Sequence, residues 1–374
     1  MNNPFAYSNY VTGESFCNRK TELSEFLKYI KNSQNVLLFS HRRYGKSSLI
    51  QQAFHQMKTK KLPVGAMYVE LYGTISEKDF ITRTFQSFNQ LESNLERLLK
   101  SLSKTIKNFK INLSIDPATG NTSVSPSFEA VNEKVVLEEL MNLLKKYSQN
   151  RKLVIAFDEF QEVAGYTEDG FEKRLRSSIQ QHSNICYIFS GSQQHLITDM
   201  FNSNTRAFYK LAESFPLDKI ETKHYIPWIQ HLFKRNNVNL PVQMIEDIIS
   251  RFENHPMYIQ NFLFHLWEEQ FKKDLSTDIL DKIEKSMIAR KDLEYTVLWE
   301  SLTINQKKTL KLILLNKGSN LFNADSLKSV NLKTASLVTK ALSSLMHKEI
   351  IEKNANYQIQ DIVFKKWLQK TLSL

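Results

Sequence analysis

The sequence comprises 374 residues, of which 41% are hydrophobic, and it carries a formal net charge of +11. This length and composition predict two or three domains with hydrophobic cores of their own. The two cysteines, Cys17 and Cys186, argue against a disulfide framework or a zinc site. Because no apolar run approaches the roughly 18 residues of a membrane span, and the N-terminus lacks the charged and apolar regions of a signal peptide, we expect a cytoplasmic protein without a membrane partner.

The first functional motif follows the apolar run Val36–Phe39, which predicts a strand. The next residues, beginning at Ser40, read S-H-R-R-Y-G-K-S and lead into a helical pattern. They resemble the phosphate-binding loop G-x-x-x-x-G-K-[ST], in which backbone N–H groups and the lysine bind nucleotide phosphates and the hydroxyl binds Mg²⁺. Gly45, Lys46 and Ser47 fit this pattern, whereas Ser40 replaces its first glycine. The simpler alternative is a surface helix that opens with a lysine and a serine.

A second motif lies further along the chain and is acidic. The run Leu153–Phe157 is apolar, as is typical of a strand buried on both faces, and it leads into Asp158 and Glu159. This resembles a Walker B strand, in which Asp158 would bind Mg²⁺ and Glu159 would act as general base on the attacking water. The alternative is a buried strand with a solvated acidic end. We favour the nucleotide site because both halves occur in the order that such folds use.

Strands and helices alternate around these two motifs. Val64–Leu71 predicts a strand, Glu77–Leu102 a helix, and Ile185–Phe189 another strand. This alternation indicates an α/β layer with a parallel sheet, whose ligands bind at the carboxyl ends of the strands. Ser190 or Ser192, after the last of these strands, is therefore a candidate contact for the γ-phosphate, although a small-residue turn explains either serine nearly as well.

The segment 104–128 interrupts this alternation. Strand-like Ile111–Ile115 and Thr122–Ser125 flank the turn residues Asp116–Asn121, which together predict a projecting β-hairpin. The hairpin is either a finger that touches DNA or another partner, or a loop that covers the sheet edge. From about Ile220 onward helical patterns dominate, with apolar stripes typical of a packed helical domain.

The end of the chain has a third pattern. Thr303–Leu315, Ala324–Val330 and Leu332–His347 predict three helices, and residues 350–359 predict a hairpin with a polar turn. Three helices followed by a two-stranded wing resemble a winged helix-turn-helix domain.

This final segment is strongly basic. Residues 301–374 hold twelve lysines against four acidic residues, which is +8 of the chain's +11, and no arginine. Such charge favours contact with double-stranded DNA, for which we expect Lys328, Lys333, Lys340 and Lys353. Because bidentate arginine is the commonest specific reader of guanine, we expect weak sequence selectivity. The alternative is a winged helix that contacts a protein partner, with lysines that only keep the surface soluble.

Taken in order, these motifs resemble the archaeal-type ATPases of the STAND and AAA+ superfamily over most of the chain. The resemblance rests on F-C-N-R-K-T-E-L at 16–23, R-R-Y-G-K-S at 42–47, F-D-E-F at 157–160 and S-G-S at 190–192. Further marks are Arg206 in R-A-F-Y, and E-N-H-P at 253–256 in place of the family's G-G-H-P.

The resemblance implies a P-loop ATPase with ATP and Mg²⁺ as cofactors, a helical lid and a winged helix. It puts Arg19 near the adenine, Ser190 near the γ-phosphate, and His255 and Pro256 on the lid. Arg206 corresponds to an arginine that reaches the nucleotide of a neighbouring copy in a nucleotide-dependent homo-oligomer, but a surface salt bridge explains it equally well. The loop residues expected to bind nucleotide are Ser40, Arg43, Tyr44, Gly45, Lys46, Ser47 and Ser48; Lys46 is also expected to be catalytic, with Glu159 and Arg206.

We therefore expect an ATPase domain over residues 1–220, a helical lid over 221–298 and a winged helix over 299–374. Two functions follow. The first is a nucleotide-dependent switch that hydrolyses ATP slowly and binds DNA through the winged helix. The second is a nucleotide-regulated interaction module, in regulation or defence, whose winged helix contacts a protein.

Overall fold

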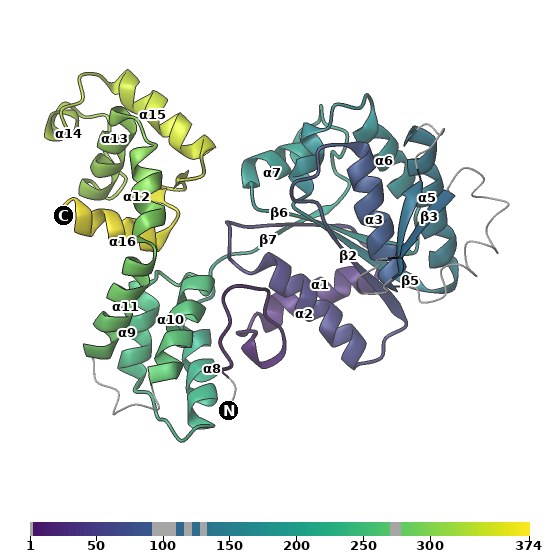
Figure 1. The fold of residues 1–374 in the computed structure, drawn as a ribbon, viewed down its shortest axis with the longest axis horizontal. Helices are drawn as coiled ribbons and strands as arrows, with labels where there is room; N and C mark the ends of the chain where they lie inside the picture. The colour runs from purple at the N-terminus through teal and green to yellow at the C-terminus, as the bar shows by residue number, and fades with distance from the viewer. Residues whose placement is uncertain (1–2, 92–109, 116–121, 128–132, 270–277) are drawn as a thin grey trace. The chain divides into compact units, whose positions relative to one another are not determined.

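The computed structural model describes residues 3–91, 110–115, 122–127, 133–269 and 278–374 (Figure 1). The chain divides into two compact units. The α/β unit contains residues 4–228 and the short segment 255–257, and the C-terminal unit contains residues 1–3, 229–254 and 258–374. No helix among the described residues is both long and apolar enough to cross a membrane.

A five-stranded sheet forms the centre of the α/β unit. Its spatial order is β2 (Val64–Glu70), β5 (Lys152–Asp158), β6 (Ile185–Gly191), β1 (Val36–Phe39) and β7 (Glu213–Pro216). Every neighbouring pair is parallel, which confirms the predicted α/β fold. Because β6 lies between β1 and β5 and is parallel to both, the carboxyl ends of these three strands meet at one edge of the sheet. The motifs that follow them are therefore neighbours in space.

Helices cover both faces of the sheet (Figure 1). On one face pack α1 (Lys20–Lys31) and α2 (Lys46–Thr59); on the other pack α3 (Glu77–Leu91), α5 (Glu133–Asn150), α6 (Phe171–Gln180) and α7 (Gln194–Asn202). Side chains that alternate along each strand pack into the cores on both faces. In β1, Val36 and Leu38 point to the first face and Leu37 points to the second. Burial on both faces explains why the strands are continuous apolar runs.

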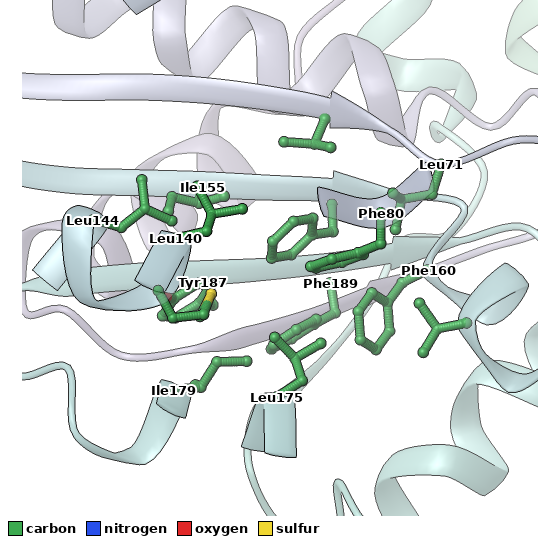
Figure 2. Packing of buried hydrophobic residues seen from close by; sticks show 14 of the residues in the cluster. Leu71, Phe80, Leu140, Leu144, Ile155, Phe160, Leu175, Ile179, Tyr187 and Phe189 are labelled. Carbon is green, nitrogen blue, oxygen red and sulfur yellow. The ribbon is translucent and has the colours of Figure 1, made fainter. Parts of the chain in front are cut away.

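Aromatic side chains fill the core beneath the ends of β5 and β6 (Figure 2). Phe157 stacks on Tyr187 and on Phe189, with ring centroids 6.2 Å apart in each pair. Phe160 packs on Phe189 with centroids 4.7 Å apart, and all four rings are buried. Such pairs contribute about 0.5–1.5 kcal/mol each beyond the burial of their area. The strand ends that carry the polar motifs therefore rest on a tightly packed base.

The segment between α3 and α5 contains two further strands. β3 (Lys110–Ile115) and β4 (Thr122–Ser127) form an antiparallel pair separate from the central sheet. The turn expected at Asp116–Asn121 lies outside the described residues, and so does the part of the helix expected over Glu77–Leu102 that follows Leu91.

Helices make up the first part of the C-terminal unit. α8 (Thr222–Lys234) leads into it and is followed by α9 (Val242–Arg251), α10 (Pro256–Glu269) and α11 (Asp278–Arg290).

The remainder has the winged-helix arrangement expected from the sequence, with one helix added on each side. Its elements are α12 (Asp292–Glu300), α13 (Ile304–Leu315), α14 (Ala324–Ser329), α15 (Ala335–His347), β8 (Ile351–Lys353), β9 (Tyr357–Ile359) and α16 (Ile362–Thr371). The prediction that a helix begins at Leu332 was wrong by three residues, because Thr334 is extended, with φ −145°. α16 was missed, although Asp361 caps it by accepting hydrogen bonds from two backbone N–H groups.

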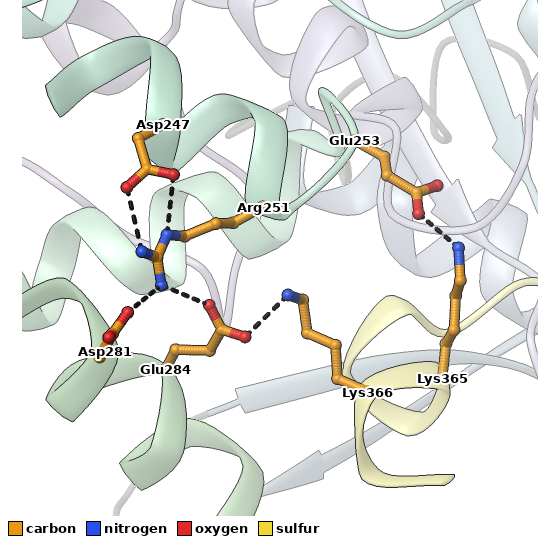
Figure 3. A network of polar contacts seen from close by, with 7 residues as sticks. All are labelled: Asp247, Arg251, Glu253, Asp281, Glu284, Lys365 and Lys366. Carbon is orange, nitrogen blue, oxygen red and sulfur yellow. Dashed lines mark hydrogen bonds and ion pairs between the residues drawn. The ribbon is translucent and has the colours of Figure 1, made fainter. Parts of the chain in front are cut away.

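Ion pairs tie α16 to the helices that precede the winged helix (Figure 3). Lys366 Nζ lies 2.7 Å from Glu284 on α11, and Lys365 Nζ lies 2.7 Å from Glu253 after α9. The complete network consists of Asp247, Arg251, Glu253, Asp281, Glu284, Lys365 and Lys366. Two of the twelve C-terminal lysines are therefore neutralised by carboxylates of their own unit.

Candidate nucleotide site

The loop between β1 and α2 has the geometry of an anion-binding loop. Gly45 precedes α2 with φ +99°, in the left-handed region that favours glycine, and Arg43 has φ +65°. The N-cap residue of α2, Gly45, has no side chain to cap the helix, and the positive dipole end of α2 is suited to an anion. Ser40 stays outside the left-handed region. A serine therefore replaces the first glycine of the pattern without backbone strain.

The side chain of Lys46 lies back along this loop. Its Nζ is 3.5 Å from the carbonyl oxygen of Ser40, and the residue is only 6% exposed. A buried ammonium group needs acceptors around it. A nucleotide phosphate at the N-terminus of α2 would be a further acceptor beside the Ser40 carbonyl oxygen.

Asp158 connects the loop helix to two neighbouring strands. Its Oδ2 accepts a hydrogen bond from Ser47 Oγ at 2.7 Å and another from the phenol of Tyr68 on β2. Its Oδ1 accepts from the hydroxyl of Ser190 on β6 and from the backbone N–H of Glu159, at 3.1 Å for the latter. Burial and the neighbouring Asp158 charge raise the pKa of Tyr68, so its phenol remains a donor. The structure thus brings together the serine and the aspartate expected to bind Mg²⁺.

Glu159 adopts a left-handed backbone conformation, with φ +52°, directly after β5. Its Oε2 accepts three hydrogen bonds: one from Gln161 Nε2 at 2.5 Å, one from Ser192 N–H at 3.1 Å and one from Ser192 Oγ at 2.8 Å. The carboxylate is therefore held by its own loop and by the end of β6.

Two further carboxylates lie near Asp158 and Glu159. Burial raises the pKa of Glu70, the charges of Asp158 and Glu159 raise it further, and a hydrogen bond from the Tyr72 N–H opposes them. Burial and the charge of Glu159 likewise raise the pKa of Glu162. This concentration of negative charge around the ends of β2 and β5 is suited to a divalent cation.

Arg19 and His255, which the sequence analysis expected near the nucleotide, both contact Tyr44 of the loop. Arg19 is 3% exposed, and its Nη2 donates to the carbonyl oxygens of Tyr44 and Asp218 at 2.9 and 2.7 Å. The ring of His255 packs edge-on against Tyr44, with centroids 5.2 Å apart. Burial, followed by nearby positive charges including Lys219, lowers the pKa of His255 to about 3, so the imidazole is neutral near pH 7.

The two residues before His255 are also informative. Glu253 and Asn254 have φ of +49° and +60°, and they stand where the family pattern has its two glycines. The backbone thus keeps the left-handed conformation that glycine adopts without strain.

A sequence model of an ATPase domain family, predominantly from Archaea, matches residues 16–262, and a model of a probable winged helix domain matches residues 293–370. The first match covers more than half of the chain. The chain belongs to this ATPase family. Residues 293–370 form the winged helix domain of this archaeal-type ATPase.

Solved structures have the same fold. The Walker-type ATPase PABY2304 of Pyrococcus abyssi is similar with a TM-score of 0.66 and 17% identity, covering 98% of this chain and 99% of that chain. The ORC2 protein of Aeropyrum pernix, solved as ADPNP–ADP complexes, has a TM-score of 0.53 and 13% identity, covering 95% of this chain and 94% of that chain. At these identities the likeness concerns the fold alone. No curated protein sequence matches this chain significantly.

Arg206 of this ATPase forms ion pairs within its own chain. Its Nη2 lies 3.1 Å from Glu172 Oε1, and its Nε lies 3.7 Å from Asp199 Oδ2. The side chain is 31% exposed. The salt bridge that the sequence analysis considered as an alternative is therefore present.

The other expected site residues fall into two groups. Ser48 faces the N-terminal segment, because its Oγ accepts a hydrogen bond from the Val11 N–H at 3.1 Å, and Pro256 is the first residue of α10. The four expected DNA-binding residues, Lys328, Lys333, Lys340 and Lys353, are all exposed on the winged helix.

Sequence reasoning missed Tyr68 and Gln161 and gave Ser192 only an alternative role. Gln161 stands two residues after Glu159, so a polar residue next to the acidic motif was a local signal for it. Tyr68 could be found only from the strand order, since its phenol reaches Asp158 because β2 lies beside β5.

Proposed function

We propose that this archaeal-type ATPase binds ATP with Mg²⁺ and hydrolyses it slowly, as a nucleotide-dependent switch. The observation that carries the proposal is that Ser47, in the first turn of α2, donates to Asp158 at the end of β5, directly before Glu159. A phosphate-binding loop, a pair of hard oxygens for a metal and a carboxylate for water are the three parts that nucleotide hydrolysis requires.

The donor set fits Mg²⁺. Ser47 Oγ and Asp158 Oδ2 lie 2.7 Å apart, and both are hard oxygens of the kind that Mg²⁺ prefers. Among the described residues no three His, Cys, Asp or Glu side chains form a metal cluster. The ion would therefore take its remaining ligands from phosphate oxygens and water, where it would neutralise developing charge on the phosphates.

The chain's own residues supply the other functions. Lys46 and the N–H groups at the start of α2 bind the β- and γ-phosphates. Glu159 accepts a proton from the attacking water as general base. In a homo-oligomer formed on nucleotide binding, Arg206 of one copy exchanges its carboxylate partners for the γ-phosphate of the next copy.

Calorimetric titration with ATP and Mg²⁺, together with a phosphate-release assay, tests this proposal. We expect Lys46→Ala to weaken ATP binding by about 10- to 100-fold, because a charge-assisted hydrogen bond contributes about 1.5–3 kcal/mol. Glu159→Gln should retain ATP binding and lose hydrolysis. The exposed variant Lys60→Ala, past the end of α2, is the matched control and should behave as the native chain. Unchanged ATP affinity in Lys46→Ala would refute the site.

The winged helix of this chain binds double-stranded DNA with weak sequence selectivity. Its support is the exposed lysines Lys328, Lys333, Lys340 and Lys353, none of which forms an ion pair among the described residues. Binding through phosphates should depend strongly on salt, and each lysine that contacts a phosphate contributes about one unit to the slope of log K against log [salt].

Fluorescence anisotropy with a labelled duplex at several salt concentrations tests the DNA proposal. We expect Lys333→Ala and Lys340→Ala each to reduce the salt slope by about one unit. Lys365→Ala is the matched control, because Glu253 already neutralises that ammonium, and its slope should stay unchanged. A native chain without salt-dependent binding would refute the proposal.

A protein partner for the winged helix is the second candidate. It is favoured by large apolar side chains on α12 and at the start of α13, since Leu293, Val297 and Ile304 are 78%, 60% and 66% exposed. Exposed apolar groups of this size are more typical of a protein interface than of a phosphate-binding surface. If DNA binding fails, Leu293→Ser and Val297→Ser should weaken binding of the partner.

A further inference from the structure

The hydrogen bonds of Glu159 have a consequence beyond the identity of the general base. All three bonds end on Oε2, and among the described residues none is donated to Oε1. A carboxylate held by one oxygen has a fixed plane and a defined direction for its second oxygen. Both donors are themselves well placed, because Gln161 is 5% exposed and Ser192 follows directly on β6.

Gly191 provides the space in which Gln161 lies. A Cβ at this position would come within 2.3 Å of Gln161 Oε1 and 2.6 Å of Ile197 Cδ1. The backbone of Gly191 is not in the left-handed region, so the requirement for glycine is one of space and not of conformation. β6 therefore accommodates Gln161 at Gly191, and the next residue, Ser192, donates to Glu159.

We propose that Gln161 and Ser192 are positioning residues that hold Oε2 of Glu159 and direct Oε1 toward the attacking water. The inference rests on the proposed ATPase function. In the step concerned, the water oxygen bonds to the γ-phosphorus, the bond from that phosphorus to the β–γ bridging oxygen breaks, and the proton of the water passes to Glu159 Oε1. ADP leaves with the bridging oxygen, and the proton is later released to solvent.

Both carboxylates, Asp158 and Glu159, accept hydrogen bonds from the end of β6. Ser190 of β6 donates to Asp158, the expected metal ligand, and Ser192, the residue directly after this strand, donates to Glu159. The two adjacent carboxylates at the end of β5 are thus held by two serines, two residues apart, at the end of β6. A shift of β6 along β5 would disturb the metal ligand and the general base together, which ties both to a single register.

The test compares steady-state hydrolysis of ATP by the full chain with that of variants at Gln161, Ser192 and their neighbours. We expect Gln161→Leu to lower kcat by about 10- to 100-fold, a part of the 10²- to 10⁴-fold that general-base catalysis supplies. Ser192→Ala should lower kcat less, by about 3- to 10-fold, because the Ser192 N–H remains as a donor. KM and ATP affinity should change by less than about 3-fold in both, since the effect is confined to the transition state. Ser192→Thr retains the hydroxyl, so its kcat should be close to that of the native chain and above that of Ser192→Ala.

Gln161→Glu separates hydrogen bonding from packing. It preserves the shape of the side chain but replaces the donor by a second carboxylate against Glu159, so it should be at least as impaired as Gln161→Leu; a residue that only fills space would tolerate it. Gln181→Leu, a glutamine at the exposed end of α6, is the matched control and should retain the native rate.

Gly191→Ala extends the test without touching either donor. It should displace Gln161 and lower kcat by a similar factor, and the double variant with Gln161→Leu should lose no more than either single one, because both remove the same contact. Native or raised kcat in Gln161→Leu and Ser192→Ala would overturn the proposal. A raised kcat would mean that the hydrogen bonds from Gln161 and Ser192 hinder Glu159 as general base. Native activity in Glu159→Gln would instead refute the general base itself, and no hydrolysis by the native chain would refute the ATPase function and this inference with it.

Discussion

Replacement of Asp158 should separate its structural role from its expected metal role. The carboxylate is 3% exposed and accepts hydrogen bonds from the hydroxyls of Ser47, Tyr68 and Ser190 and from one backbone N–H. Asp158→Ala leaves these donors without their acceptor. Asp158→Asn keeps an oxygen acceptor in nearly the same shape, and hydroxyl groups can turn to accept from its amide.

The magnitude follows from the burial of the donors. Ser190 is fully buried, so its orphaned hydroxyl costs about 1–3 kcal/mol, whereas water can reach the half-buried Ser47 and Tyr68, which cost less. Removal of the Asp158 charge also relieves its repulsion of Glu70 and Glu159, which recovers part of the lost stability. We therefore expect Asp158→Ala to destabilise the nucleotide-free α/β unit by about 2–4 kcal/mol, and Asp158→Asn by less than about 1.5 kcal/mol.

Hydrogen exchange measured by mass spectrometry suits this comparison, because the chain has two units and a single unfolding transition cannot be assumed. Peptides from β5 and β6 report on the α/β unit, and peptides from α15 serve as the internal reference. Both variants should also lose the stabilisation that Mg²⁺ adds to ATP binding. Native protection of β5 and β6 in Asp158→Ala would show that the three hydroxyls do not depend on this carboxylate, and the reasoning would fail.

Three further predictions concern other parts of the chain. Gly318→Ala should unfold the winged helix, at a cost above about 3 kcal/mol, because its φ is +76° and a Cβ would lie 1.9 Å from the Tyr357 carbonyl oxygen; native exchange protection there would contradict this. The pKa of His255 is near 6.5 in the unfolded chain and about 3 in the folded chain. The stability that the neutral imidazole contributes is therefore fully present above pH 6.5 and falls by about 2 kcal/mol by pH 5. Calorimetry of His255→Phe should show a shallower dependence of stability on pH. Glu253→Lys and Lys365→Glu should each weaken protection of α16 by about 0.5–1 kcal/mol, and the double exchange should restore it; additive losses would argue against their ion pair.

Local patterns were enough for several features of this chain. The phosphate-loop residues Gly45 to Ser47, the apolar strand before Asp158 and the winged-helix pattern could all be recognised because strand and helix periodicity and short motifs act over neighbouring residues. The start of α15 was misplaced, because the side-chain pattern does not reveal the extended backbone at Thr334. α16 went unrecognised despite the capping residue Asp361.

Contacts between distant segments required the folded chain. Sequence order does not state that β6 lies between β1 and β5, and so it could not tell which of two serines meets which carboxylate. The fold assigns Ser190 to Asp158 and Ser192 to Glu159, and it brings Tyr68 and Gln161 into the same group.

The sequence by itself determined the chemistry on offer: a phosphate loop, two adjacent carboxylates and a basic winged helix. Only the tertiary structure decided how these groups are held, because hydrogen bonds between strands depend on strand order and register. The same holds for charge. Twelve lysines in the last 74 residues are evident from composition, but packing of α16 against α11 and the end of α9 pairs Lys365 and Lys366 with carboxylates and leaves Lys328, Lys333, Lys340 and Lys353 exposed on the winged helix.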